Sequence, residues 1–147
     1  MPNPDRPQAP GYLANLMARL FHEVAGEGLV PLGIAPPMFP LLVELWFGDT
    51  PVSRASLAAT QEMEVADIDA LVVAMAEAGL IERFAADPAA VLVLTAKGEA
   101  AKGPAVAAAR RANATAAAVL DEAEMAQLLG LMNRLIDALQ GAKGQGG

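Results

Sequence analysis

The sequence predicts a mainly α-helical protein in which a helix–turn–helix and a small β-hairpin lie between long helices. Three observations predict this fold class. Apolar residues recur at intervals of three and four over most of the chain, as on one face of an α-helix. Residues 80–83 and 91–94 are instead short β-prone runs on either side of an Asp-Pro loop. Alanine makes up much of the 54% apolar content, and alanine favours helix over a thick core.

Composition and charge narrow the class of protein. The chain has 147 residues, the size of one ordinary domain, and its lack of cysteine excludes disulfides and thiolate metal sites. Residues 1–10 do not resemble a secretion signal, and the longest uncharged run, residues 28–43, is broken by prolines. A net charge of −7 disfavours unspecific binding to nucleic acid or to an anionic membrane. We therefore expect a soluble cytoplasmic protein with no membrane partner.

The N-terminal part is predicted to contain a disordered arm at residues 1–10 and then two helices. The first helix, residues 11–29, carries one stripe of apolar residues that we expect to be buried: Leu13, Leu16, Met17, Leu20, Phe21 and Val24. Pro36 and Pro37 suit the first turn of the second helix, which Gly48 ends. The apolar face of this second helix consists of Leu41, Leu42, Leu45 and Trp46.

Residues 53–98 hold the helix–turn–helix and the hairpin. Ser53 is a suitable N-cap for a short helix that ends near residue 60, with Leu57 in the core. After a turn at residues 61–64, the next helix is predicted over residues 65–78, and Gly79 suits its C-terminal end. The core face of that helix consists of Ile68, Leu71, Val72 and Met75. Two strands, residues 80–83 and 91–94, then form the hairpin around a loop at residues 84–90.

Two more helices are predicted after residue 94. Thr95 suits the N-cap of the first, which should continue to about residue 119 with an interruption or kink at residues 102–104, Lys-Gly-Pro. Asp121 with Glu124 three residues later resembles a capping box at the start of the second. The apolar face of the second helix consists of Met125, Leu128, Leu129, Met132, Leu135, Ile136 and Leu139. A flexible tail is expected at residues 141–147.

The order and spacing of several short motifs resemble the MarR family of bacterial winged-helix transcriptional regulators. The motifs are Leu57-Ala58, residues 68–75, Gly79-Leu80-Ile81-x-Arg83 and Leu94-Thr95-x-x-Gly98. The resemblance extends over roughly residues 11–140. It implies a winged head at residues 32–98, between an N-terminal dimerisation helix at residues 11–31 and C-terminal dimerisation helices at residues 99–140. It also implies a homodimer that binds double-stranded operator DNA under the control of a small-molecule effector.

The resemblance also implies which residues contact DNA. The helix at residues 65–78 would enter the major groove, and the hairpin, which is the wing, would touch the minor groove. The candidate DNA-binding residues are Arg54, Asp67, Asp69, Ala70, Val73, Arg83 and Asp87. The sequence departs from the family pattern in the wing, where Pro88-Ala89-Ala90 stands in place of the usual arginines.

The charge of the head favours an alternative function. Residues 32–98 contain three basic and nine acidic side chains, a net charge of −6, whereas DNA binding depends on phosphate neutralisation by Lys and Arg. A carboxylate in the major groove can accept a hydrogen bond from cytosine N4, but Asp67 and Asp69 also suit a helix N-terminus without any function. The alternative is a winged-helix dimer with weakened or lost DNA binding that acts as a protein-interaction or anti-repressor module.

A small-ligand pocket is the second candidate site that the resemblance implies. Its candidate residues are Leu16, Arg19, His22, Met38, Phe39, Leu42 and Trp46. Core packing is the simpler explanation for the apolar residues around Trp46, and Arg19 suits an ion pair with Glu23 on the same helix face. His22 is the only histidine, and a single histidine without cysteine makes no metal site. No nucleophile–base pair or phosphate-binding loop is visible, so we expect neither an enzyme nor a cofactor.

Overall fold

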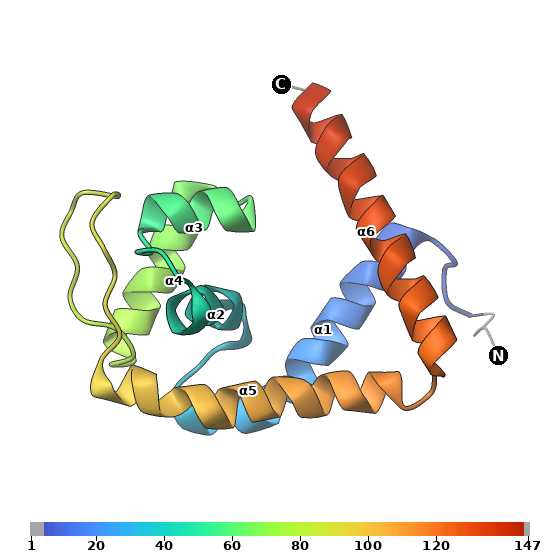
Figure 1. Cartoon of the computed structure of the whole chain (residues 1–147), viewed down its shortest axis with the longest axis horizontal. Helices are drawn as coiled ribbons and strands as arrows, with labels where there is room; N and C mark the ends of the chain where they lie inside the picture. Colours follow the sequence, from blue (N-terminus) through green and yellow to red (C-terminus); the bar gives the residue numbers. More distant parts are fainter. Residues whose placement is uncertain (1–4, 146–147) are drawn as a thin grey trace. The chain divides into compact units, whose positions relative to one another are not determined.

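The structure, a computed structural model, describes residues 5–145 and consists mostly of helices (Figure 1). The chain divides into two compact units, residues 1–111 and residues 112–147, and each is described by itself. The helices, in chain order, are α1 (Pro10–Leu29), the short 3-10 turns η1 (Val30–Leu32) and η2 (Pro36–Met38), α2 (Phe39–Phe47), α3 (Arg54–Gln61), α4 (Val65–Glu77), α5 (Ala96–Ala117) and α6 (Glu122–Gln145). The predicted arm and tail fall partly outside the described residues, and residues 141–145 are helical rather than part of a tail.

Four predicted helix ends, at Ser53, Gly79, Thr95 and Asp121, are confirmed by their local geometry. Ser53 and Ser56 form a reciprocal capping box at the start of α3, with distances of 2.9 and 3.1 Å. The Gly98 N–H donates to Thr95 Oγ1 at 3.0 Å, which caps the start of α5. Gly79 has a φ of 76°, so a glycine fits the left-handed turn that ends α4. In the second unit, Asp121 and Glu124 exchange hydrogen bonds of 2.8 and 3.0 Å before α6.

The predicted strands at residues 80–83 and 91–94 are not confirmed, because no β-strand forms in residues 5–145. Two isolated antiparallel bridges take their place, one between Ser53 and Val91 and the other between Ile81 and Leu94. The Leu92 N–H donates to the Val52 carbonyl at 2.8 Å. Residues 91–94 thus pair on one edge with residues 52–53 and on the other edge with residues 80–82, where the Glu82 N–H donates to the Val93 carbonyl at 2.8 Å. We use the name wing below for residues 81–94.

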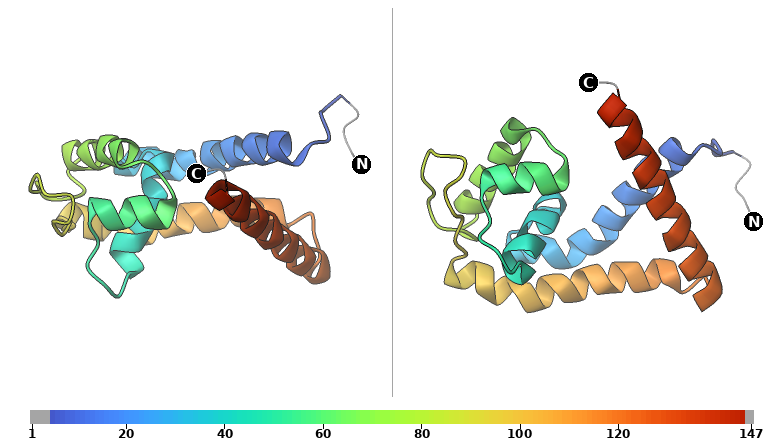
Figure 2. Two further views of the ribbon diagram at one scale, coloured as in Figure 1. Left: turned by 90° about the horizontal axis from the view of Figure 1, so that it is seen from above. Right: turned by 45° about the horizontal axis from the view of Figure 1, so that its top comes forward.

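The core of the first unit lies among α2, α3 and α4, which pack together in both views of Figure 2. Leu57, Ile68, Val72 and Met75 are fully buried, as their spacing predicts. On α2, the Trp46 Nε1–H donates to the Gly98 carbonyl at 3.0 Å. The other buried members of this core are Leu29, Ile34, Met38, Leu41, Leu42, Val52, Leu80, Ile81, Leu92, Ala101, Ala105 and Ala108.

The predicted burial of the apolar stripe on α1 is wrong for the single chain. Met17, Leu20 and Val24 are exposed, and the buried residues of α1 are Gly26 and Leu29, near its C-terminal end. Burial begins there because α1 passes close to α5: a Cβ added to Gly28 would lie 2.7 Å from the Ala108 Cβ. The apolar face of α6 is also largely exposed.

The predicted interruption of α5 at Pro104 does not occur. α5 is one helix from Ala96 to Ala117 with Pro104 inside it. Proline lacks the N–H that would bond to the carbonyl four residues earlier, on Ala100. Ala100 and Pro104 are both exposed, so a water molecule can donate a hydrogen bond to the Ala100 carbonyl in place of the missing N–H.

No single helix among residues 5–145 has the length and apolar character needed to span a membrane. A bent pair, Pro10–Leu32 with Pro36–Phe47 at 87°, meets those criteria jointly by length and composition.

Alanine substitutions at two glycines of α5 should change the free energy of unfolding in opposite directions. A Cβ on Gly98 would overlap the carbonyl oxygen of Leu80, whereas a Cβ on Gly103 would meet nothing within 4 Å. We expect Gly98→Ala to lower the free energy of unfolding by about 1–3 kcal/mol through overpacking. Gly103→Ala should raise it by roughly 0.5–1 kcal/mol, because alanine favours a helix interior over glycine. Urea unfolding followed by circular dichroism, at one protein concentration, measures both, and equal effects would contradict this packing.

Candidate nucleic-acid interface

Arg54, the first residue of α3, lies inside the head with only 7% of its surface exposed. Its Nη1 donates to Asp69 Oδ1 on α4 at 3.1 Å. Its Nη2 donates to the carbonyls of Ala85 and Ala86 in the wing, both at 2.9 Å. The guanidinium carbon also lies 4.8 Å from the ring centroid of Phe84. One side chain therefore joins α3, α4 and the wing, and we call this set of contacts the Arg54 clamp.

The start of α3 holds both arms of the wing. Arg54 contacts the outgoing arm at residues 84–86, while the Ala55 N–H donates to the Pro88 carbonyl at 3.1 Å on the returning arm. Arginine suits this position because its planar fork of N–H donors can reach a carboxylate and two carbonyls at once. The clamp thus supplies hydrogen bonds to the wing that a longer β-ladder would otherwise provide.

The clamp changes the environment of two predicted DNA-binding residues. The sequence predicts Arg54 on phosphate and Asp69 on the outer face of α4. The structure brings the two together as partners of one another, with the Asp69 side chain 41% exposed and that of Arg54 almost enclosed. Their assignment to DNA stays a prediction, and the observed geometry gives them a role in positioning the wing.

The outward face of α4 carries three small apolar side chains and, at its C-terminal end, one carboxylate. Ala66, Ala70, Val73 and Glu77 recur at intervals of four, three and four, on the side opposite the buried Ile68. All four are exposed, and Val73 exposes 45% of its surface. We call these four residues the outer stripe. Ala70 and Val73 belong to the predicted site, whereas Ala66 was missed, although its spacing of four from Ala70 could have identified it.

The side-chain hydrogen-bond donors of the helix–turn–helix, residues 53–77, all lie in residues 53–61, and four of these five residues donate inside the head, although the buried Arg54 Nε has no partner. Ser53 and Ser56 form the capping box, and Arg54 forms the clamp. Thr60 Oγ1 and Gln61 Nε2 both donate to Glu44 Oε2 on α2 at 2.6 Å. From residue 62 to residue 77 the sequence contains no side chain with an N–H or O–H donor when its carboxylates are ionised. The exposed face of this motif therefore offers acceptors and apolar atoms.

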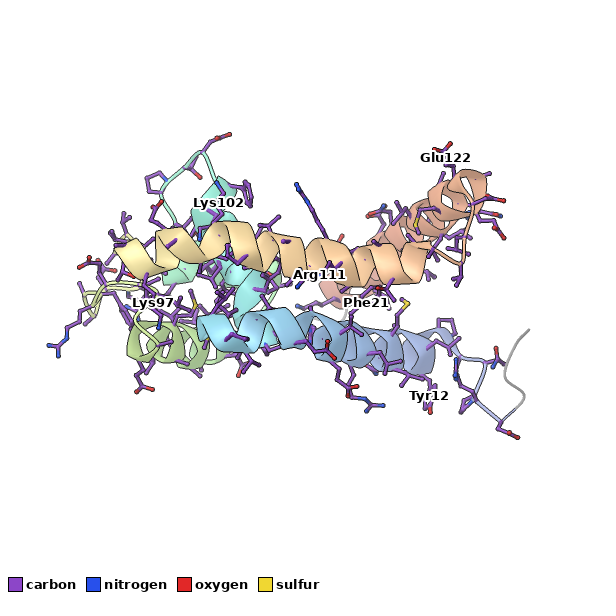
Figure 3. All side chains as sticks on the ribbon, turned by 90° about the horizontal axis from the view of Figure 1, so that it is seen from below. Tyr12, Phe21, Lys97, Lys102, Arg111 and Glu122 are labelled. Carbon is purple, nitrogen blue, oxygen red and sulfur yellow. The ribbon has the colours of Figure 1, made fainter. Side chains whose placement is uncertain are left out.

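The cations of the head are few, and two of the three have internal partners. Lys97 Nζ donates to the Ala78 carbonyl at 2.5 Å, at the end of α4 (Figure 3). Arg83 is exposed, and in residues 32–98, all of which the structure describes, it is the one cation with neither a hydrogen bond nor an ion pair. Asp87 is exposed in the wing, where its Oδ1 accepts a hydrogen bond from the Ala89 N–H at 2.9 Å. Arg83 is thus the side chain best placed to contact a phosphate.

The residues of the predicted ligand pocket fall into two groups. Met38, Leu42 and Trp46 are buried in the core, and the half-buried Phe39 packs edge-on against Trp46 with ring centroids 6.1 Å apart. On α1, Leu16 is half-buried, whereas Arg19 and His22 are exposed. Core packing accounts for the first group, and the pocket stays a prediction from the family resemblance.

An open groove of about 380 Å³ lies elsewhere in the first unit, where the sequence predicts no site. Lys102 Nζ is 4.4 Å from the ring centroid of Phe47, on the side of α5 next to α2 (Figure 3). The groove is lined by Phe47, Lys102, Gly103, Val106, Ala107 and Arg110. The spacing of Lys102, Val106 and Arg110 by four residues along α5 is the signal that could have identified it.

The Arg54 clamp predicts a local effect on the wing. Arg54→Met keeps the apolar stem but removes the hydrogen bonds to Asp69, Ala85 and Ala86, so the wing should open more often. We expect the amide hydrogens of Leu92 and Ala55, which bond across the base of the wing, to exchange roughly tenfold faster. The matched control is Arg83→Met, which removes an exposed cation of the same wing. Hydrogen exchange measured by NMR tests this, and unchanged protection in Arg54→Met would contradict the clamp.

The chain was compared with known proteins. No family model matches the sequence, and no curated protein matches it significantly. Many solved structures do match. A probable transcriptional regulator from Pseudomonas aeruginosa is 27% identical, with 87% of this chain and 97% of that chain covered and a TM-score of 0.73.

Two further matches carry the family in their names. A MarR family protein from Mycobacterium tuberculosis, solved in complex with DNA, is 25% identical, with 88% of this chain and 98% of that chain covered and a TM-score of 0.63. A MarR transcriptional regulator from Methanosarcina mazei Go1 is 15% identical over 89% of this chain and 94% of that chain, with a TM-score of 0.77. The match extends over the helix–turn–helix and the long helices on both sides of it. The resemblance found in the sequence is therefore confirmed: this chain has the fold of the MarR family of winged-helix transcriptional regulators and is similar to its members.

Proposed function

We propose that this chain is a MarR-type transcriptional regulator that binds a short duplex operator as a homodimer. The observation that carries the proposal is the head, in which α3, a turn, an outward-facing α4 and the wing follow one another between long helices. The Mycobacterium tuberculosis protein of the same fold, 25% identical over nearly its whole length, was solved bound to DNA. Such a regulator acts in the cytoplasm and has no catalytic activity of its own.

Exposed apolar side chains on α1 and α6 support the homodimer. On α6 they expose between 36% and 70% of their surface: Leu128, Leu129, Leu131, Met132, Leu135, Ile136 and Leu139. On α1, Tyr12, Met17, Leu20 and Val24 expose between 39% and 48%, and Figure 3 shows Tyr12 projecting from the helix. Monomeric proteins rarely leave contiguous apolar patches in water, and a second copy of the same chain would cover them.

In the proposed complex, α4 enters the major groove with its outer stripe toward the bases. Arg83 contacts phosphate near the wing, and Arg54 holds the wing in place without touching DNA itself. A small-molecule effector, which the family resemblance implies, would act by changing the spacing of the two heads.

A second candidate function is favoured by the engaged donors of residues 53–77 and by the head charge of −6. In this alternative the dimer binds a basic protein surface through α4, and DNA binding is weak or lost. Asp67 and Glu77 are the acidic residues for such a contact, because both are exposed on α4 and neither belongs to the Arg54 clamp.

One pair of substitutions separates the two functions. Asp67→Lys with Glu77→Lys adds cations to the exposed side of α4 and leaves the clamp intact. If α4 faces DNA, the pair should tighten binding to unrelated duplexes by roughly tenfold at low salt. The control pair Glu27→Lys with Asp49→Lys makes the same change in charge away from α4 and should tighten it less.

Selection of bound genomic fragments at low salt, with a dimer verified by light scattering, tests the proposal itself. We expect a small set of fragments that share a roughly palindromic site. If the folded dimer binds no fragment, the proposal of DNA binding is contradicted. The second function would be established instead by two results together. The unmodified dimer binds a protein partner but no DNA, and the α4 charge reversal abolishes binding of that partner.

A further inference from the structure

The outer stripe of α4 restricts which base edges the head can recognise. We propose that α4 reads thymine, through the C5-methyl group, and not the acceptor edges of purines. This inference rests on the DNA binding proposed above and states what that binding recognises.

The first argument is the chemistry of the stripe. Residues in the N-terminal part of a recognition helix are those that contact base edges. On the outer stripe of α4 the residues in that part are Ala66 and Ala70, and Val73 follows on the same face; all three are exposed and end in methyl groups. In the major groove, the apolar feature that a base pair presents to a protein is the thymine methyl, which apolar side chains contact.

The second argument is the lack of available donors. Guanine presents N7 and O6 and adenine presents N7 in the major groove, and reading these acceptors requires an N–H or O–H donor. Side-chain donors in residues 53–77 are confined to Ser53, Arg54, Ser56, Thr60 and Gln61, all of which precede α4. Ser53 caps the start of α3 as an acceptor, and the other four donate inside the head. A purine acceptor facing α4 would therefore lose its water without gaining a side-chain donor.

The third argument concerns the carboxylates. Asp69 is paired with Arg54, so the acidic side chain that remains near the start of α4 is Asp67. A carboxylate accepts from the amino groups of cytosine or adenine and is repelled by guanine O6. The half-site read by α4 should thus contain thymines opposite the stripe, and the base that faces Asp67 should be cytosine or adenine, not guanine.

The small size of Ala66 and Ala70 is consistent with this mode of reading. Long polar side chains reach base edges from a helix that lies some distance above them. An alanine methyl contacts a thymine methyl only when the helix backbone comes close to the floor of the groove. Two alanines on adjacent turns leave the space for that approach.

The experiment begins with the site selected from random duplexes at low salt by the unmodified dimer. Each thymidine of the half-site is then replaced by deoxyuridine, which removes the C5-methyl and keeps the base-pairing edge. Dissociation constants are measured by fluorescence anisotropy, and the same replacement in the flanks is the control. We expect roughly a fourfold loss of affinity for each contacted methyl and no loss in the flanks.

The Val73→Ala variant shows whether α4 is the reader. Val73 is 45% exposed, so its truncation should leave the fold intact, and the deoxyuridine penalty at one thymine of the half-site should disappear. Val30→Ala, at a 69% exposed valine of η1, should keep the full penalty.

The outcomes separate this inference from the proposed function. If no duplex binds, the proposed function fails and this inference fails with it. If a selected site binds but tolerates deoxyuridine within twofold at every position, DNA binding stands and the inference is overturned. A half-site rich in guanine that weakens on 7-deazaguanine replacement would overturn it as well.

Discussion

The buried guanidinium of Arg54 is the interaction on which the geometry of the head depends. It lies where α3, α4 and the wing meet, and it donates to a carboxylate and to two backbone carbonyls. The wing has one bridge between its own arms, at Ile81 and Leu94, so its position relies on contacts from the start of α3. Removing this cation would leave the Ala85 and Ala86 carbonyls without their donor and would free Asp69.

The same interaction determines what the head can offer to a partner. Arg54 would be a natural phosphate contact if it were exposed, but its donors are directed inward. Thr60 and Gln61 are likewise engaged by Glu44. The exposed side of α4 is left with methyl groups and carboxylates, and Arg83 is the cation without an internal partner. The stability of the head and the electrostatic part of the DNA binding that we propose thus depend on the same side chains.

Much of the fold could be predicted from the sequence because its causes are local. Periodicity located the helices, and the caps at Ser53, Thr95 and Asp121 located their starts. The strands are not confirmed, because the two arms of the wing share a single bridge, and the second bridge, from Val91 to Ser53, joins distant segments that local β-propensity cannot detect. The role of Arg54 was missed for the same reason: sequence shows its charge, whereas its burial depends on three elements that meet only after folding. The exposed stripe on α1 was predicted as buried because periodicity identifies an apolar face but not what covers it.

The salt dependence of operator binding tests most directly whether the head has few cations available for DNA. Each phosphate contact contributes about −0.9 to the slope of log K against log salt concentration. With Arg83, and at most Lys97, available in each head, a dimer should make roughly two to four such contacts and give a slope of about −2 to −4. A slope of about −7 or steeper would require many more ionic contacts and would contradict the account.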